Sequence, residues 1–187
     1  MAFTAFLDTC TLFGGYLCDT FLRLAEAETY RPLWSADVLD ELHRNLLRRG
    51  LAEPAVNHRI NSMRRAFPDA DVTGYQSLMP GLTCDEKDRH VLAAAIRGSA
   101  DVLVTFNISD FPARSTEQFD LDVITPDDFL LDQLDLHPST VIEALDGQAD
   151  AYRRPPVSTD ELLHRLTAAG VPRFSQDAQL QINRPPP

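Results

Sequence analysis

Short apolar runs and longer stretches with helical spacing follow one another along the chain. The short runs lie at residues 5–7, 102–105 and 122–124, and each is typical of a strand. Apolar side chains recur every three or four positions in four longer stretches, at residues 11–28, 35–50, 54–67 and 85–97. Strands separated by helices predict parallel βαβ units, so we expect an α/β fold with helical layers around a small parallel sheet.

Capping residues predict where these helices begin and end. Ser35 is a good N-cap for the second helix, and Gly50 is a good residue to end it. Pro54 suits the first turn of the helix that follows. These positions indicate two consecutive helices with a tight connection between them.

The character of the sequence changes after about residue 136. Two short helices are expected at residues 140–152 and 160–169, the second capped by Ser158 or Thr159 and stopped by Gly170. We therefore predict a main domain over residues 1–136 and a helical extension over residues 137–187, with a flexible tail at Arg184–Pro187. The extension is too short and polar to form its own core, so we expect it to pack on the main domain or on a partner.

Composition narrows the class of protein. The 187 residues are 44% apolar and 24% charged, which is typical of a globular chain with a real core. The sequence has no run of eighteen apolar residues, so it predicts no membrane span. Its three cysteines are an odd number without CxxC spacing, which indicates reduced thiols in a cytoplasmic protein.

Charge is distributed unevenly. Seventeen basic and 28 acidic residues give a net charge of −11, which excludes nucleic-acid binding through the general surface. Residues 43–65 carry six arginines and one acid, so this segment is +5 and the remainder is −16. It is either a pair of solvated helix faces or a local phosphate-binding patch. The six arginines are Arg44, Arg48, Arg49, Arg59, Arg64 and Arg65.

Oxygen-bearing side chains follow two of the predicted strands. Asp8 and Thr9 come after the first, and Asn107 and Asp110 come after the run at residues 102–105. Ligands of parallel α/β sheets bind at the carboxyl ends of the strands, so these groups are expected to lie close together. No glycine-rich loop is present that would hold a phosphate with backbone amides.

Two acids on helices complete this set. Glu41 lies at the edge of the buried stripe of its helix, and Asp88 lies in the first turn of the helix before the apolar run at residues 102–105. Oxygen ligands without a histidine or cysteine cluster suit a hard cation, so we expect Mg²⁺, with Mn²⁺ as a substitute.

Each acid also has a purely structural explanation. Asp85 is a good N-cap, with Asp88 as the N3 half of a capping box. Asp110 suits a turn, and Glu41 suits an exposed helix face beside Arg44. The residues alone leave these alternatives open.

Four segments together resemble the acidic motifs of PIN-domain nucleases, and within that superfamily the VapC-type toxins in their longer form with a C-terminal extension. The resemblance covers roughly residues 1–135. The segments, in order, are Phe6–Thr9, Ser35–Leu42, Asp85–Ala95 and Val104–Pro112.

The resemblance assigns roles to the acids. It implies that Asp8, Glu41 and Asp88 are the first, second and third acids of the site. The family often has Asp after the Val-Thr strand, whereas this chain has Asn107, and Asp110 is the residue that could substitute for it.

The same resemblance implies a metal site and two supporting hydroxyls. Asp8, Asp88, Asn107 and Asp110 would hold the metal, and Asp110 would join the first three acids in catalysis. Thr9, Thr105 and Asp85 would support them.

The resemblance also implies a fold and a function. The fold would be a three-layer α/β/α sandwich, and the activity would be Mg²⁺-dependent hydrolysis of RNA phosphodiester bonds. The six arginines would steer the RNA backbone toward the acidic site. Similar toxins act as homodimers and are inhibited by a small antitoxin with a basic segment, which would suit the acidic remainder of this chain.

Two other functions compete with this one. A phosphatase of the HAD type also has Asp after its first strand, but it expects Asp-x-Asp where this chain has Asp8-Thr9-Cys10. A PIN-like module without catalysis is the second alternative, because Asn107 weakens the acidic set.

Overall fold

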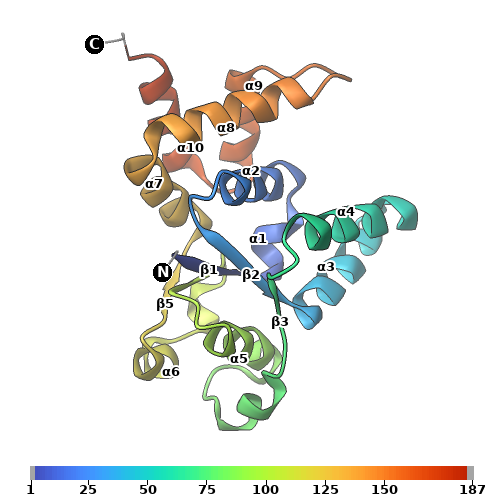
Figure 1. Ribbon diagram of the computed structural model, residues 1–187, viewed down its shortest axis with the longest axis vertical. Helices are drawn as coiled ribbons and strands as arrows, with labels where there is room; N and C mark the ends of the chain where they lie inside the picture. The colour runs from blue at the N-terminus through green and yellow to red at the C-terminus, as the bar shows by residue number, and fades with distance from the viewer. Residues whose placement is uncertain (1–2, 185–187) are drawn as a thin grey trace. The chain divides into compact units, whose positions relative to one another are not determined.

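The strands of the chain form one five-stranded parallel sheet (Figure 1). The computed structural model describes residues 3–184, and the expected flexible end at residues 185–187 lies outside the described residues. The strand order is β3-β2-β1-β4-β5 and every pairing is parallel. The strands are β1 (Thr4–Leu7), β2 (Arg31–Ser35), β3 (Asp71–Val72), β4 (Val102–Val104) and β5 (Asp122–Ile124). The α/β class and the parallel sheet predicted from the sequence are confirmed.

Burial explains why the central strands are runs of apolar residues. All residues of β1 and β4 are buried, whereas β5 at the edge is partly exposed. A parallel strand covered on both faces loses the alternation of polar and apolar positions, so it reads as a continuous apolar run.

Two strands were not predicted. β2 contains Pro32 and ends at Ser35, the residue that the sequence predicts as the N-cap of a helix. Pro32 is the second residue of β2 and pairs with Ala5 of β1. A proline argues against a strand in a sequence pattern. β3 has only two residues, too few for any pattern.

The chain forms two compact units, and the first contains the sheet. It comprises the residues up to Phe13 together with Tyr30–Thr125. Helices flank the sheet within it, and α1 packs on α3 and α3 on α4. Its helices are α1 (Thr9–Phe13), α3 (Ala36–Arg48), α4 (Glu53–Ala66), α5 (Arg89–Arg97) and α6 (Ala113–Thr116), with 3₁₀ turns η1 (Gln76–Gly81), η2 (Glu86–Asp88), η3 (Ile108–Asp110) and η4 (Glu117–Phe119).

Helix ends follow the predicted caps closely. The Ser35 hydroxyl accepts a hydrogen bond from the Val38 N–H at 3.3 Å and so caps α3. Gly50 follows the end of α3 with φ +94°, a left-handed conformation that glycine adopts without strain. The helix predicted over residues 11–28 is instead two helices, because the chain is extended at Gly14.

The second unit is helical and comprises Gly14–Thr29 and the chain from Pro126 onward. Its helices are α2 (Gly15–Glu26), α7 (Pro126–Leu136), α8 (Pro138–Ala151), α9 (Thr159–Ala168) and α10 (Pro172–Ile182). The expected boundary at residue 136 falls between α7 and α8. The extension packs on α2 and α7, which lie before that boundary. The rings of Phe21 on α2 and Phe129 on α7 stack at 5.3 Å in the same unit. α10 was not predicted.

Polar contacts tie α2 to the C-terminal helices within this unit. The Thr20 hydroxyl donates to Gln148 Oε1 at 2.8 Å, and Gln148 Nε2 donates to the Tyr16 carbonyl at 2.9 Å. The Tyr152 hydroxyl donates to Asp19 Oδ2 at 2.8 Å. Buried polar groups that are fully paired select one arrangement of helices.

Within residues 3–184, no helix is long and apolar enough to cross a membrane.

Candidate functional site

Asp8 is held rigidly where β1 ends. Its backbone N–H donates to the Val104 carbonyl at 3.1 Å, which continues the pairing of β1 with β4. Its Oδ1 accepts from the Thr9 N–H at 2.6 Å, and its Oδ2 accepts from the Thr105 hydroxyl at 2.7 Å. The side chain is buried, with a relative exposure of 7%. Donors on both oxygens fix the direction of the carboxylate.

Glu41 reaches the same place from α3. The Thr9 hydroxyl donates to Glu41 Oε2 at 3.1 Å, so one threonine contacts both Asp8 and Glu41. Glu41 is half-buried. Its position depends on the Ser35 cap, which determines where α3 begins.

Asp88 is the last residue of η2 and the N-cap of α5, and one of its oxygens is left without a hydrogen bond. Oδ2 is buried and has no hydrogen-bond partner in the described part of the chain. Burial raises the pKa of this carboxyl above its ordinary value; the Lys87 ammonium opposes the increase, and the charges of Asp110 and Asp8 add to it. A buried oxygen without a partner costs free energy, which a bound cation would recover.

Asn107 and Asp110, the two residues considered for the fourth position, have different surroundings. The Asn107 N–H donates to the Thr105 hydroxyl at 3.0 Å, and Asn107 lines the pocket described below. Asp110 is in η3, where its Oδ2 lies 3.8 Å from the Lys87 ammonium. Asp85 caps η2, since its Oδ1 accepts from the Lys87 N–H at 3.1 Å.

These groups surround a pocket of about 490 Å³ at the carboxyl edge of the sheet. Three of the predicted acids face it, and Asp110 is not among the residues that line it. The lining residues are Asp8, Thr9, Cys10, Phe13, Glu41, Asn45, Arg48, Arg49, Asp88, Val91 and Asn107. One pocket thus combines carboxylates with two guanidinium groups.

The donor chemistry of the pocket fits a hard divalent cation. Asp8, Asp88 and Asn107 present oxygen atoms, and the unpaired Oδ2 of Asp88 is available to a cation. Among residues 3–184, no group of three or more His, Cys, Asp or Glu side chains is assembled closely enough to hold a metal. The carboxylates would therefore have to move closer together around a bound ion.

Cys10 contacts the acidic cluster directly, which the sequence did not predict. Its thiol donates to Asp8 Oδ2 at 3.2 Å and accepts from the Phe106 N–H at 3.3 Å. Burial and the neighbouring Asp8 charge raise the pKa of this thiol to about 11. The group is therefore a protonated hydrogen-bond donor at neutral pH and a poor nucleophile.

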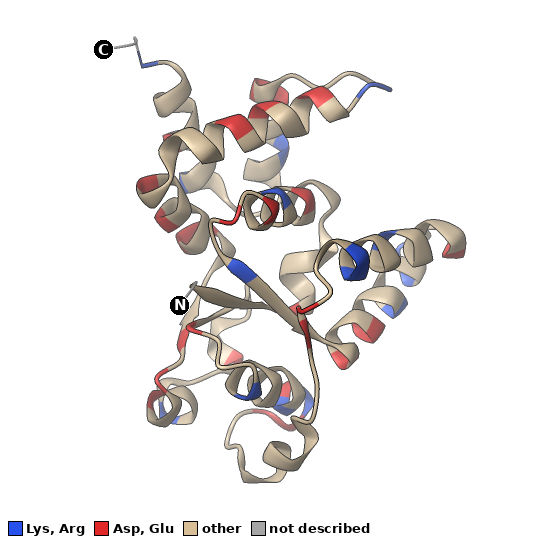
Figure 2. Ribbon diagram, viewed as in Figure 1, with Lys and Arg blue, Asp and Glu red and all other residues tan. Residues whose placement is uncertain are grey.

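The six arginines do not form one patch. Arg48 and Arg49 line the pocket, and the Arg49 guanidinium lies 6.0 Å from the Phe13 ring centroid. Figure 2 shows basic residues along both α3 and α4. Arg44 is exposed on α3, and Arg65 is exposed on α4, where it donates to the Ser62 hydroxyl.

Two further arginines are engaged by other groups of the protein. Arg59 donates to the carbonyls of Leu12 and Phe13, which are the C-terminal residues of α1. Arg64 pairs with Asp71 at 3.0 Å. Phe13 and Asn45 were not predicted as site residues; both are on helices, and only the packing of α1 on α3 reveals that they share a pocket.

Comparisons with known proteins match both parts of the chain. A family model described as PIN domain matches residues 4–109, and one described as VapC50 C-terminal domain matches residues 126–179. The chain is 42% identical over 106 residues to "Putative ribonuclease VapC50" of Mycobacterium tuberculosis strain H37Rv. That match covers 57% of this chain and 62% of the relative. No solved structure matches the chain significantly.

Proposed function

The chain belongs to the PIN-domain family, and from this premise we propose that it is a metal-dependent endoribonuclease that hydrolyses RNA phosphodiester bonds. The observation that carries the proposal is the single pocket that joins Asp8, Glu41 and Asp88 to Arg48 and Arg49. A pocket with carboxylates alone would repel the RNA backbone, and a pocket with arginines alone would bind RNA without hydrolysing it. A relative named as a ribonuclease supports the same activity.

The chain's own residues would divide the work. Asp8 and Asp88, with the Asn107 amide, would hold Mg²⁺ or Mn²⁺. When bound, the ion would neutralise charge on the phosphodiester and make a nearby water more acidic. Glu41, held by the Thr9 hydroxyl, would accept the proton of an attacking water. Thr105 would keep the Asp8 carboxylate in its direction.

The arginines would position the substrate. Arg48 and Arg49 line the pocket beside the acids, where their guanidinium groups would bind phosphate oxygens on either side of the cleaved bond. Arg59 would contribute indirectly, because it supports the end of the helix that carries Thr9 and Cys10.

We further propose that the protein is a cytoplasmic toxin of a toxin–antitoxin pair. The charge of −16 outside residues 43–65 suits a small antitoxin with a basic inhibitory segment. Expression of the parent chain in a bacterium should arrest growth, whereas expression of Asp8→Asn should not. Growth arrest by both chains would contradict a role of the acidic site in toxicity.

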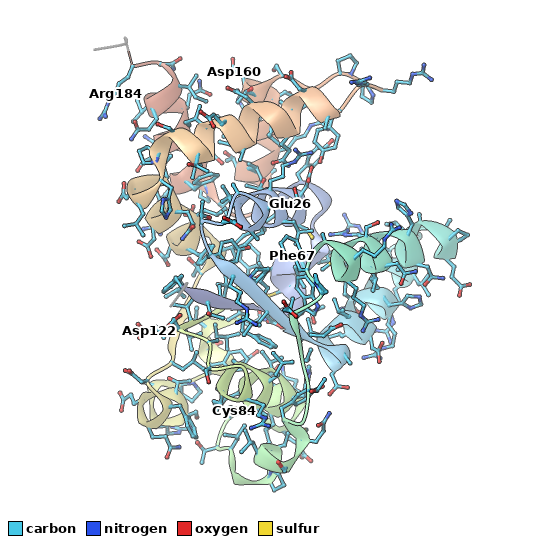
Figure 3. The ribbon with its side chains drawn as sticks, in the orientation of Figure 1. Glu26, Phe67, Cys84, Asp122, Asp160 and Arg184 are labelled. Carbon is cyan, nitrogen blue, oxygen red and sulfur yellow. The ribbon has the colours of Figure 1, made fainter. Side chains whose placement is uncertain are left out.

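The direct test is cleavage of total RNA and transfer RNA with Mg²⁺ or Mn²⁺, and then with EDTA. Asp8→Asn should reduce cleavage to background. Asp122→Asn is the matched control, because Asp122 is exposed at the start of β5 (Figure 3), whereas the pocket lies at the carboxyl ends of the strands. Equal cleavage by Asp8→Asn and the parent would refute the proposal.

A binding module without catalysis is the second candidate, favoured by Asn107 in the pocket and by the absence of a preassembled metal cluster within residues 3–184. It predicts binding of RNA with no cleavage by the parent chain in either metal. The same experiment therefore separates the two functions.

A further inference from the structure

Lys87 is the only lysine in the 187 residues, and it lies at the candidate site. Its ammonium is 3.8 Å from Asp88 Oδ2 and 3.8 Å from Asp110 Oδ2. The side chain extends from η2 and connects this turn to η3. One cation of the chain therefore stands between the third acid and the residue considered for the fourth position.

The distances from the Lys87 ammonium to the two carboxylates are too long for hydrogen bonds, so the ammonium acts on them through its charge. The lone pairs of Asp88 Oδ2 remain unused, since this oxygen has no hydrogen-bond partner in the described part of the chain. Lys87 thus balances the charge of Asp88 and leaves this oxygen able to bind a metal ion. The Lys87 side chain is 68% exposed, so it can shift at little cost.

Asn107 and Asp110 differ in whether they line the pocket. Asn107 lines it and Asp110 does not, so the neutral amide faces the pocket and the carboxylate faces the lysine. A second divalent ion would need Asp110 as a ligand, because an amide contributes no charge. The affinity of an oxygen site for a divalent ion depends on the number of charged ligands.

We propose that the Lys87 ammonium is a built-in counter-cation that takes the place of a second metal ion, so that Asp110 binds Lys87 and the site holds one divalent ion between Asp8 and Asp88. This inference rests on the proposed function, since it assumes that the pocket binds a metal. It predicts that loss of the lysine charge strengthens metal binding, whereas loss of a merely structural residue would weaken it.

The test counts Mn²⁺ bound to the full chain by calorimetry and by the electron paramagnetic resonance signal of free Mn²⁺. The parent and Lys87→Arg should bind one ion. Lys87→Met should bind a second ion, or the first about fivefold more tightly, because Asp88 and Asp110 are then unbalanced. Arg31→Met is the matched control: it removes one positive charge from the exposed start of β2, at the opposite edge of the sheet, and should behave like the parent.

A second readout uses the single lysine as a probe. Reductive methylation with ¹³C keeps its charge and gives one dimethyl-lysine resonance. The first equivalent of Mn²⁺ should broaden this resonance, which would place the ion beside Lys87 without any measurement of activity.

The outcomes separate the two proposals. Two ions bound by the parent, or identical stoichiometry and affinity in Lys87→Met and the parent, would overturn the role of Lys87 and leave the nuclease proposal standing. An unbroadened lysine resonance with one bound ion would likewise overturn it. No Mn²⁺ binding by any variant would refute the metal site itself, and with it this inference.

Discussion

Arginine substitutions should separate the guanidinium groups that meet RNA from those that hold the protein together. Arg48 and Arg49 line the pocket, whereas Arg64 on α4 pairs with Asp71 at 3.0 Å. The perturbation is the double variant Arg48→Gln with Arg49→Gln, and the matched control is Arg64→Gln. All three positions are exposed, so each substitution should leave the fold intact.

The expected size follows from counterion release. For single strands, each phosphate contact contributes about 0.7 to the slope of log affinity against log salt. Removing two pocket arginines should therefore reduce the slope by about 1.4. Between 50 and 200 mM salt the parent should lose about sevenfold more affinity than the double variant. Arg64→Gln should keep the parent's slope, because its charge is already balanced by Asp71.

Fluorescence anisotropy of a labelled RNA oligonucleotide measures this slope. The titrations are run in EDTA, which prevents metal-dependent cleavage, at four or more salt concentrations. An unchanged slope in the double variant would refute the assignment of Arg48 and Arg49. A reduction in Arg64→Gln as large as that of the double variant would show that the whole segment binds RNA and that the pocket has no special role.

Three other predictions test features of the fold and the site. Asp127→Ala should lower the free energy of unfolding by about 2–3 kcal/mol, because the carboxylate accepts from the Phe174 N–H at 2.9 Å and pairs with Arg173 at the start of α10. Urea denaturation measures this loss, and an unchanged midpoint would contradict the prediction. Gly98→Ala should cost about 1–3 kcal/mol in thermal unfolding, since a Cβ there would lie 2.7 Å from Leu33 Cδ1, and an unaltered melting temperature would show that the neighbours relax. Alkylation of Cys10, followed by mass spectrometry, should accelerate about tenfold per pH unit from pH 7 to 10, because its pKa is about 11 and only the thiolate reacts; a plateau near pH 9 would show an ordinary thiol.

Local rules were sufficient for several elements of this chain. The Ser35 cap and Gly50 bracket α3 as predicted, and Ser158 and Gly170 bracket α9. Capping depends on atoms within three or four residues, so a short window of sequence contains the whole interaction. The buried strand β4 is visible for a similar reason, because burial on both faces leaves a continuous apolar run.

Other elements depended on partners that are distant in the sequence. β2 is a strand because β1 and β3 pair with it, although Pro32 argues against a strand locally. α10 is stabilised at its start by Asp127, 47 residues before the N–H that it accepts from. Neither partner can be read from the segment itself.

The sequence by itself determined which chemistry is present: oxygen-bearing acids after the strands, six arginines in one segment and a single lysine. The tertiary structure decided which of these groups meet. It brings Thr105 within 2.7 Å of Asp8 across 97 residues, and it turns Asp110 toward Lys87. The physical reason is that a side chain's type is local, whereas its neighbours are set by strand order and helix packing, which bring distant segments together only after the whole core has formed.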